Sequence, residues 1–223
     1  MELAACGLAK RFRRNTGDAN FLEAVHPVDL TMHSGEMMVL TGRSGSGKTT
    51  LLTMLAGLLP PSDGTAALDG KDLYSLSDAG LSRMRARHFA VIPQGASAVT
   101  SMTVMENILF TASLAGKDPP VRQAETLMER LGILKLRNVW PGELSGGELR
   151  RMSIVRALAA GPDFVFADEP TADLDDGNTA LTLGILKETA LEGSAVFVVT
   201  HDREAAAYAD VLLRMDAGKL YKI

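Results

Sequence analysis

Apolar and polar positions follow two different spacings along this 223-residue chain. Four short, continuous apolar runs are bounded by turn residues, which is typical of strands that are buried on both faces. Between them lie longer stretches in which apolar residues recur at helical spacing. The pattern therefore predicts an α/β fold in which helices cover a mostly parallel sheet. The four predicted strands are residues 37–40, 89–92, 164–167 and 195–200.

A smaller amount of antiparallel β structure is predicted toward both ends of the sequence. Val28, Leu30 and Met32 alternate with polar neighbours, which is the pattern of a strand with one buried face. Residues 65–68 form a short strand between two Asp-Gly turn signals, and residues 211–223 have the pattern of a β-hairpin. We therefore expect an antiparallel β subdomain beside the parallel core.

Helical spacing dominates the middle of the chain. Thr103 and Glu106 form a capping box, and helical spacing relates the apolar residues after it: Val104, Ile108, Leu109, Ala112 and Ala115. The simplest organisation is a single domain, 1–223, with a helical subdomain at about 95–157 inserted into a P-loop-type core of about 1–94 and 158–223. Other helices are predicted at 50–59, where Pro60-Pro61 stops the helix, and at 72–87, 121–131, 149–160 and 178–192.

Composition narrows the possible functions. A net charge of −4 and a pI near 5.6 disfavour direct binding to nucleic acid or to an anionic membrane surface. Hydrophobic residues make up 46% of the chain, yet no apolar run approaches the roughly 20 residues that span a bilayer. Cys6 is the single cysteine, and the N-terminus lacks a signal-peptide pattern. We expect a cytoplasmic protein whose contact with any membrane comes through another polypeptide.

A glycine-rich segment connects the strand at 37–40 to the predicted helix at 50–59. It matches G-x-x-x-x-G-K-[ST], in which backbone N–H groups and a helix N-terminus surround a polyphosphate. Lys48 would reach the β- and γ-phosphates, and the Thr49 hydroxyl would bind Mg²⁺. The alternative is a glycine-rich turn that caps an ordinary helix. The residues expected to bind nucleotide here are Gly42, Arg43, Ser44, Gly45, Ser46, Gly47, Lys48, Thr49 and Thr50.

A second candidate anion site lies at residues 144–148, with the sequence Leu-Ser-Gly-Gly-Glu. Ser145 and Glu148 form a capping box, and the two glycines between them expose backbone N–H groups beside a hydroxyl. The alternative is a well-capped helix that follows a tight turn.

Polar residues follow three of the predicted parallel strands. Asp168 and Glu169 end the strand at 164–167, and because neighbouring strand residues point to opposite sides, their roles should differ. We expect Asp168 to bind Mg²⁺ and Glu169 to polarise the attacking water, the alternative being an acidic helix cap. Gln94 and His201 follow two other strands, so all these groups should meet at one edge of the sheet.

In this order the motifs resemble those of the ATP-binding cassette, the nucleotide-binding subunit of ABC transporters, over nearly the whole chain. The resemblance implies that Gln94 senses Mg²⁺ and the attacking water. It also implies that Asp175 lies in a loop that crosses between subunits and that Phe12 stacks on adenine; for Phe12 the alternative is an apolar residue that ends the first strand. The residues implied to bind the γ-phosphate of ATP held by the opposite subunit are Ser145, Gly146 and Gly147.

The same resemblance implies partners and a role. Two copies would pack head to tail around two ATP and Mg²⁺ and drive a separate transmembrane permease subunit, at the inner face of the cell membrane and without nucleic acid. The most similar group contains lipoprotein-releasing, macrolide-exporting and cell-division-associated cassettes, which implies export or extraction of a lipid-linked, peptide or drug-like cargo. Leu149, where relatives commonly carry Gln, and the small residues at 96–101 depart from that pattern. The alternative is a regulatory or assembly ATPase that acts as a nucleotide-gated switch without transport.

Overall fold

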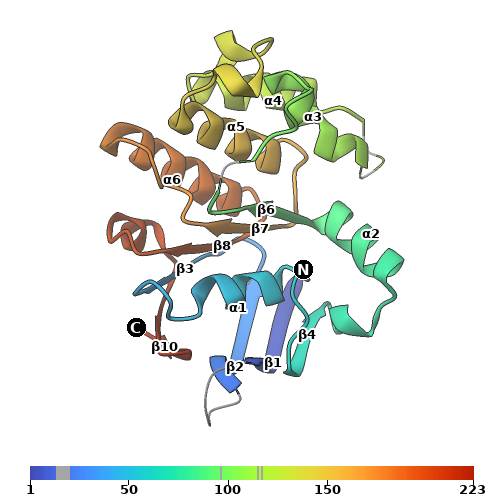
Figure 1. Ribbon diagram of the computed structural model, residues 1–223, viewed down its shortest axis with the longest axis vertical. Helices are drawn as coiled ribbons and strands as arrows, with labels where there is room; N and C mark the ends of the chain where they lie inside the picture. Colours follow the sequence, from blue (N-terminus) through green and yellow to red (C-terminus); the bar gives the residue numbers. More distant parts are fainter. Residues whose placement is uncertain (14–20, 96, 115, 117) are drawn as a thin grey trace.

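Two β-sheets form the framework of the protein. The computed structural model describes the chain except residues 14–20, 96, 115 and 117, so the predictions for Ala96 and Ala115 lie outside the described residues. A six-stranded sheet crosses the middle of the molecule, and a four-stranded sheet lies beneath it in the view of Figure 1. The α/β prediction is confirmed.

The six-stranded sheet contains all four predicted parallel strands. Its order is β10-β9-β3-β8-β7-β6, and every neighbouring pair is parallel except β10 with β9. Parallel pairing brings the carboxyl ends of β3, β8, β7 and β6 to one edge, as the sequence predicts. The strands are β3 (Met37–Gly42), β6 (Phe89–Ile92), β7 (Phe164–Asp168), β8 (Ala195–Thr200), β9 (Val211–Asp216) and β10 (Lys219–Lys222).

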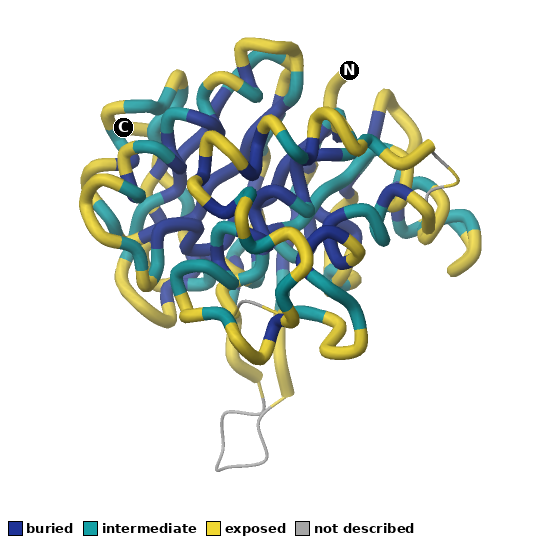
Figure 2. The backbone as a smooth tube through the Cα atoms, turned by 90° about the horizontal axis from the view of Figure 1, so that it is seen from above, coloured by how far each residue is buried: buried dark blue, intermediate teal, exposed yellow. Residues whose placement is uncertain are grey.

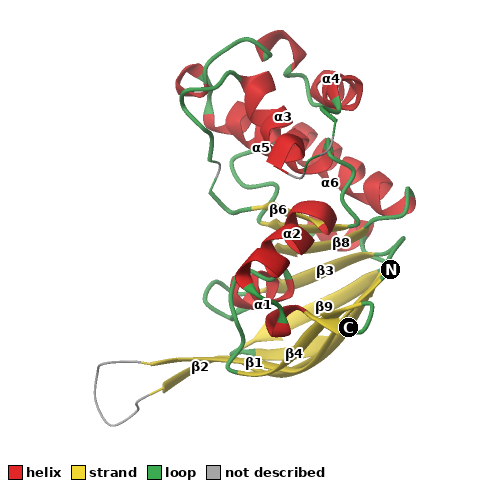
Figure 3. Cartoon of the chain, turned by 90° about the vertical axis from the view of Figure 1, so that its right-hand side faces the viewer, coloured by secondary structure: helices red, strands yellow, loops and turns green. Residues whose placement is uncertain are grey.

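The four-stranded sheet is antiparallel and has the order β2-β1-β4-β5. Figure 3 shows β1 and β2 extending together beyond the body of the protein. Helix α1 (Lys48–Leu55) lies between the two sheets, and its buried leucines belong to a core shared with both. The strands are β1 (Glu2–Arg13), β2 (Phe21–His33), β4 (Asp63–Leu68) and β5 (Lys71–Asp72).

The remaining helices gather mainly on the opposite side of the parallel sheet. Helices α3, α4 and α5 form a group above it in Figure 1, with α6 between that group and the strands. The helices are α2 (Asp78–His88), α3 (Val104–Leu114), α4 (Val121–Arg130), α5 (Gly146–Leu158) and α6 (Asp176–Leu191). Short 3-10 helices occur at Leu73–Ser75, Leu134–Leu136, Pro141–Glu143 and Glu204–Tyr208. No helix in the described ranges is long and apolar enough to cross a membrane.

Most helices differ from the sequence prediction by a few residues at their ends, and two of them differ more. Helix α1 ends at Leu55 because Gly57 adopts a left-handed conformation (φ 66°) and its N–H donates to the Met54 carbonyl at 3.2 Å. A glycine, and not Pro60, therefore stops this helix. The helix predicted at 72–87 is divided, because Ser77 Oγ accepts a hydrogen bond from Gly80 N and caps a new helix, α2.

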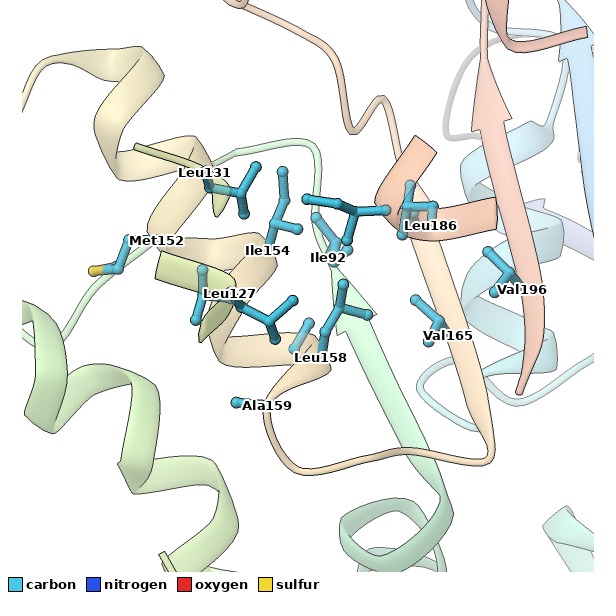
Figure 4. Close-up of a cluster of buried hydrophobic side chains, with 14 of the residues drawn as sticks. Ile92, Leu127, Leu131, Met152, Ile154, Leu158, Ala159, Val165, Leu186 and Val196 are labelled. Atoms are coloured by element: carbon cyan, nitrogen blue, oxygen red, sulfur yellow. The ribbon is translucent and has the colours of Figure 1, made fainter. Parts of the chain in front are cut away.

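A single apolar core joins the helical group to the sheet. Figure 4 shows Leu127 of α4, Leu131 just after α4, and Ile154 and Leu158 of α5. These side chains face the strand residues Ile92, Val165 and Val196. Figure 2 shows that the buried residues gather toward the centre of the molecule, with exposed segments around them. Close packing of this kind holds the strand ends in fixed relative positions, which is what a site built from several strands requires.

Candidate nucleotide site

A cavity of about 670 Å³ opens at the carboxyl edge of the parallel sheet. Its walls come from the loop before α1, the ends of β6, β7 and β8, and the outer part of the β1–β2 pair. Leu22, Glu23, Ala24, Ala217 and Gly218 also line it, and the sequence did not mark them. The residues that the sequence predicted and that line it are Phe12, Ser44, Gly45, Gly47, Lys48, Thr49, Thr50, Gln94, Asp168, Glu169 and His201.

The loop before α1 is wrapped around the end of that helix. Gly47 precedes the first helical residue with φ 105°, and a Cβ there would collide with the Ala24 carbonyl oxygen. Gly218 N donates to the Ser46 carbonyl at 3.0 Å, which ties the loop to the β9–β10 turn. The loop is therefore held in place by two segments remote from it in sequence.

Lys48 is a buried cation whose charge is satisfied by the loop itself. Its side chain is 7% exposed, and Nζ donates to the carbonyls of Gly42 (2.8 Å) and Arg43 (3.1 Å). Holding the ammonium group in this way places positive charge at the cavity wall together with the N-terminus of α1. An anion that enters the cavity meets both.

Asp168 and Thr49 form the first of two polar pairs in the cavity. The Thr49 hydroxyl donates to Asp168 Oδ2 at 2.8 Å. Burial raises the pKa of Asp168 above its ordinary value, while the hydrogen bond from Thr49 and the charges of Lys48 and Arg150 partly oppose that effect. These are hard oxygen donors, and Mg²⁺ in nucleotide sites is usually held by one or two such groups together with substrate phosphates. The pair therefore fits Mg²⁺.

Glu169 and His201 form the second pair. Glu169 has a left-handed backbone (φ 49°) and is 8% exposed, whereas the His201 side chain is 76% exposed. His201 Nδ1 lies 2.9 Å from Glu169 Oε1, and the Thr200 hydroxyl donates to Oε2 at 2.8 Å. The turn at Glu169 sends its carboxylate away from that of Asp168, so two consecutive acids have separate partners. Gln94 is exposed at the rim of the same cavity.

Phe12 lies near the outer end of β1 and is 39% exposed. Its ring lines the cavity and is 5.4 Å from Lys10 Nζ, measured from the ring centroid. The residue thus ends a strand and also presents an aromatic face to the cavity, so both interpretations of Phe12 agree with its position. The role of the ring in binding a base stays a prediction.

Several predicted residues do not line the cavity. Gly42, Arg43 and Ser46 belong to the same loop but lie outside the cavity wall. Ser145 caps α5: its Oγ accepts from Glu148 N at 3.3 Å, and Glu148 Oε2 accepts from Ser145 N at 2.9 Å. The predicted capping box is confirmed. The candidate residues on this second, exposed or half-buried surface are Ser145, Gly146, Gly147 and Asp175, the last of which caps α6 through Asn178 N at 2.8 Å.

Two further residues, which hold the acids and strand ends of the site, were also missed from the sequence. Thr200 is a buried hydroxyl that holds Glu169, and in the sequence it is simply the last residue of a strand. Arg150 is 2% exposed and donates to backbone carbonyls at the ends of β6 and β7. Its spacing of four from Ile154 and seven from Ala157 places it on the buried face of α5, and that signal could have singled it out.

The arrangement of a phosphate-type loop, two acids and a capped helix in a mixed α/β fold defines a nucleotide-binding cassette. The sequence matches the family described as ABC transporter over residues 25–172, and the chain belongs to this family.

Curated relatives include proteins named ATP-binding/permease proteins and proteins named ATP-binding proteins. The macrolide export ATP-binding/permease protein MacB 2 of Aeromonas hydrophila subsp. hydrophila is 37% identical over 216 residues, which is 96% of this chain but 33% of that protein. The lipoprotein-releasing system ATP-binding protein LolD of Shewanella frigidimarina is 40% identical over 196 residues, covering 86% of this chain and 82% of that protein. The chain thus spans about a third of the length of the export ATP-binding/permease relatives.

Solved structures share the whole fold. A dimeric ATP-binding cassette in a post-hydrolysis state, bound to ADP and Pi, superposes with a TM-score of 0.89 at 25% identity. A dimeric bacterial ABC transporter cassette superposes with a TM-score of 0.90 at 26% identity. In each case 99% of this chain and 98% of the other chain are covered. The chain therefore has the complete cassette fold.

Proposed function

We propose that the protein binds and hydrolyses ATP as the cassette of an ABC transporter. The observation that carries this proposal is the meeting, in one cavity, of the glycine-rich loop with two separately held acids, Asp168 and Glu169. Phosphoryl transfer to water requires three groups: a loop that binds phosphates, an acid that holds a metal ion and an acid that polarises the water. All three would be present here.

The residues on the cavity wall would divide the work. Backbone N–H groups of the loop and the Lys48 ammonium would bind the β- and γ-phosphates. Glu169, with Oε2 held by Thr200, would accept a proton from the attacking water at its carboxylate. His201, whose Nδ1 lies 2.9 Å from Glu169 Oε1, would also contact an oxygen of the γ-phosphate. Gln94 would help to orient the water.

Thr49 and Asp168 would hold Mg²⁺. When bound there, the ion would neutralise charge that develops on the β- and γ-phosphate oxygens. Because Thr49 already donates to Asp168, the two oxygens are positioned side by side before any ligand arrives, and little reorganisation is needed.

The second surface would complete the site of another copy of the chain. Ser145, Gly146 and Gly147 present a helix N-terminus to solvent, and Asp175 is exposed at the start of α6. In a head-to-tail dimer each γ-phosphate would be bound by the loop of one chain and by this helix N-terminus of the other. The dimeric cassettes that share the fold support this arrangement.

The partner outside the dimer would be a transmembrane permease subunit. The relatives named as export ATP-binding/permease and lipoprotein-releasing proteins support a role in export or extraction of lipid-linked, peptide or drug-like cargo. The protein would then be cytoplasmic and bound at the inner face of the membrane through that partner. A helical subdomain at about 95–157 would pass nucleotide-dependent movement to it.

Substitution of Glu169 tests the proposal. Glu169→Gln should keep ATP affinity within about threefold and lower kcat by at least about 100-fold, because an amide cannot accept the proton of the attacking water. Lys48→Ala should instead weaken ATP binding by at least about tenfold, since it removes charge-assisted hydrogen bonds to phosphate. Binding is measured by calorimetry and turnover by phosphate release.

A matched control separates these effects from general damage. Glu188→Gln changes an exposed carboxylate on α6 that pairs with Arg130, and it should leave both affinity and turnover unchanged. Wild-type turnover in Glu169→Gln, or unchanged ATP affinity in Lys48→Ala, would contradict the assignment.

A further inference from the structure

Arg150 is a buried cation that bonds to no carboxylate directly. Its guanidinium group donates to five main-chain carbonyls, and the described residues place no acidic side chain within salt-bridge distance of it. Nε donates to the Pro170 carbonyl at 3.1 Å and Nη2 to that of Asp168 at 2.9 Å. The other acceptors are the carbonyls of Pro93, Gln94 (3.3 Å) and Glu169.

The five carbonyls belong to two different loops. Pro93 and Gln94 follow β6, whereas Asp168, Glu169 and Pro170 end or follow β7. The two strands pair as far as Ile92 with Ala167, and Arg150 connects the chains just beyond that last pair. One side chain from α5 thus joins the segment that carries Gln94 to the segment that carries Glu169.

The contact with Glu169 acts on its backbone conformation. A left-handed φ of 49° is unfavourable for a residue other than glycine and persists only where the surroundings hold it. Glu169 N donates to the Val199 carbonyl at 2.8 Å, and Arg150 Nη2 binds the Glu169 carbonyl. The peptide groups on both sides of the residue are therefore fixed, and this conformation aims the carboxylate at Thr200 and His201.

Arg150 keeps its positive charge at this point in spite of its burial. Burial lowers the pKa of Arg150, and the nearby carboxylates of Asp168, Asp173 and Glu169 oppose that effect. An arginine remains protonated in spite of such a shift. A planar cation with five donors matches five converging carbonyls, and a lysine ammonium, with three donors on one atom, cannot reach both loops in the same way.

We propose that Arg150 is a positioning residue for ATP hydrolysis: it fixes the backbone of Glu169 and Gln94 relative to one another, so that their side chains meet the same water. This inference rests on the proposed function. A shift of about 1 Å in a reacting group can cost about 100-fold in rate. Loss of Arg150 should therefore affect turnover far more than nucleotide binding, which depends on the loop before α1.

Two variants test the proposal in the full chain. Arg150→Gln should lower kcat by about 100-fold while the ATP dissociation constant stays within about threefold of wild type. Arg150→Lys, which keeps the buried charge but not the fork of donors, should lower kcat by about tenfold. If the glutamine variant does not fold, kcat and the ATP dissociation constant of the lysine variant are compared with those of wild type instead. Arg156→Gln, at a half-buried arginine further along α5 that lacks these hydrogen bonds, is the control and should turn over as wild type does.

Two further readouts distinguish positioning from a purely structural role. In nucleotide-free protein, Arg150→Gln should accelerate amide hydrogen exchange at residues 94–95, 168–169 and 171 and leave 37–41 unchanged. On a Glu169→Gln background, the same substitution should lower the residual kcat by less than about threefold, because it acts through Glu169.

Wild-type kcat in Arg150→Gln, or an equal loss of kcat on both backgrounds, would overturn the inference. Wild-type protein that binds no ATP and releases no phosphate would instead overturn the proposed function, so the two failures are distinguishable.

Discussion

At the scale of residues, the site depends on how two consecutive acids are separated. Asp168 ends a strand and bonds to Thr49, while the left-handed turn at Glu169 directs the next carboxylate to Thr200 and His201. In the proposed function the first acid would hold Mg²⁺ and the second would polarise the attacking water. This arrangement costs stability because the carboxylate of Asp168 is buried. The burial raises the pKa of Asp168 above its ordinary value.

Asp168→Asn should therefore stabilise the protein in the absence of nucleotide and Mg²⁺. Between the ordinary and the raised pKa, the folded state holds a proton that the unfolded state has lost, so stability falls as pH rises through that window. At pH 7 the asparagine variant avoids this loss and still accepts the hydrogen bond from Thr49. We expect a gain of about 1 kcal/mol, or roughly 3 °C in Tm, together with loss of ATP hydrolysis.

Calorimetry at pH 7 and at pH 4 checks this prediction, since the gain should shrink in acid. Asp175→Asn is the control of opposite sign: hydrogen bonds from Asn178 lower the pKa of Asp175, so neutralising it should not raise Tm. A lower Tm for Asp168→Asn at pH 7 would contradict the account.

At the scale of elements, the N-terminus of α5 carries a glycine that the packing of the chain does not require. Ser145 and Glu148 cap each other, whereas a Cβ on Gly146 would meet no atom within 4 Å in this structure. Gly146 also has no left-handed φ, so alanine fits its backbone. The chain by itself gives no steric reason for a glycine here, and a closely approaching phosphate does.

Gly146→Ala separates these two requirements. It should raise the stability of the isolated chain by about 0.4 to 1 kcal/mol, because alanine lowers the entropy of the unfolded state. In the Glu169→Gln background it should weaken ATP-induced dimers by about tenfold, measured by sedimentation. Gly184→Ala, at an equally open position within α6, is the control. It should raise the stability of the chain by a similar amount and leave the affinity of the dimer unchanged. Equal dimer affinity in the two variants would contradict the role of Gly146.

The sequence predicted the elements well where apolar runs or caps define them. The four parallel strands and both capping boxes are present, because apolar runs and N-capping residues are local features of the sequence. The end of α1 was placed too late, since the conformation of Gly57 depends on packing. Arg150 and Thr200 were missed because their function lies in contacts with carbonyls and a carboxylate that are distant in sequence.

At the scale of the whole molecule, the proposed function requires one chain to carry two complementary halves of a site. The cavity holds the loop, both acids and His201, whereas the capped N-terminus of α5 lies on a different, exposed surface. A single copy therefore cannot bring its own Ser145 to its own Lys48 without disrupting the core that joins α5 to the sheet. Two copies related by a twofold axis can satisfy both surfaces at once, which is how closed dimers form.

The most direct test mixes two inactive variants. Lys48→Ala removes the phosphate-binding cation of one chain, and Ser145→Arg blocks the helix N-terminus of the other. A mixed dimer has one site with both defects and one site with neither. If about half of the dimers are mixed, an equimolar mixture should recover roughly a quarter of the wild-type ATPase rate. A mixture that stays as inactive as each variant alone would contradict the claim that two chains build each site.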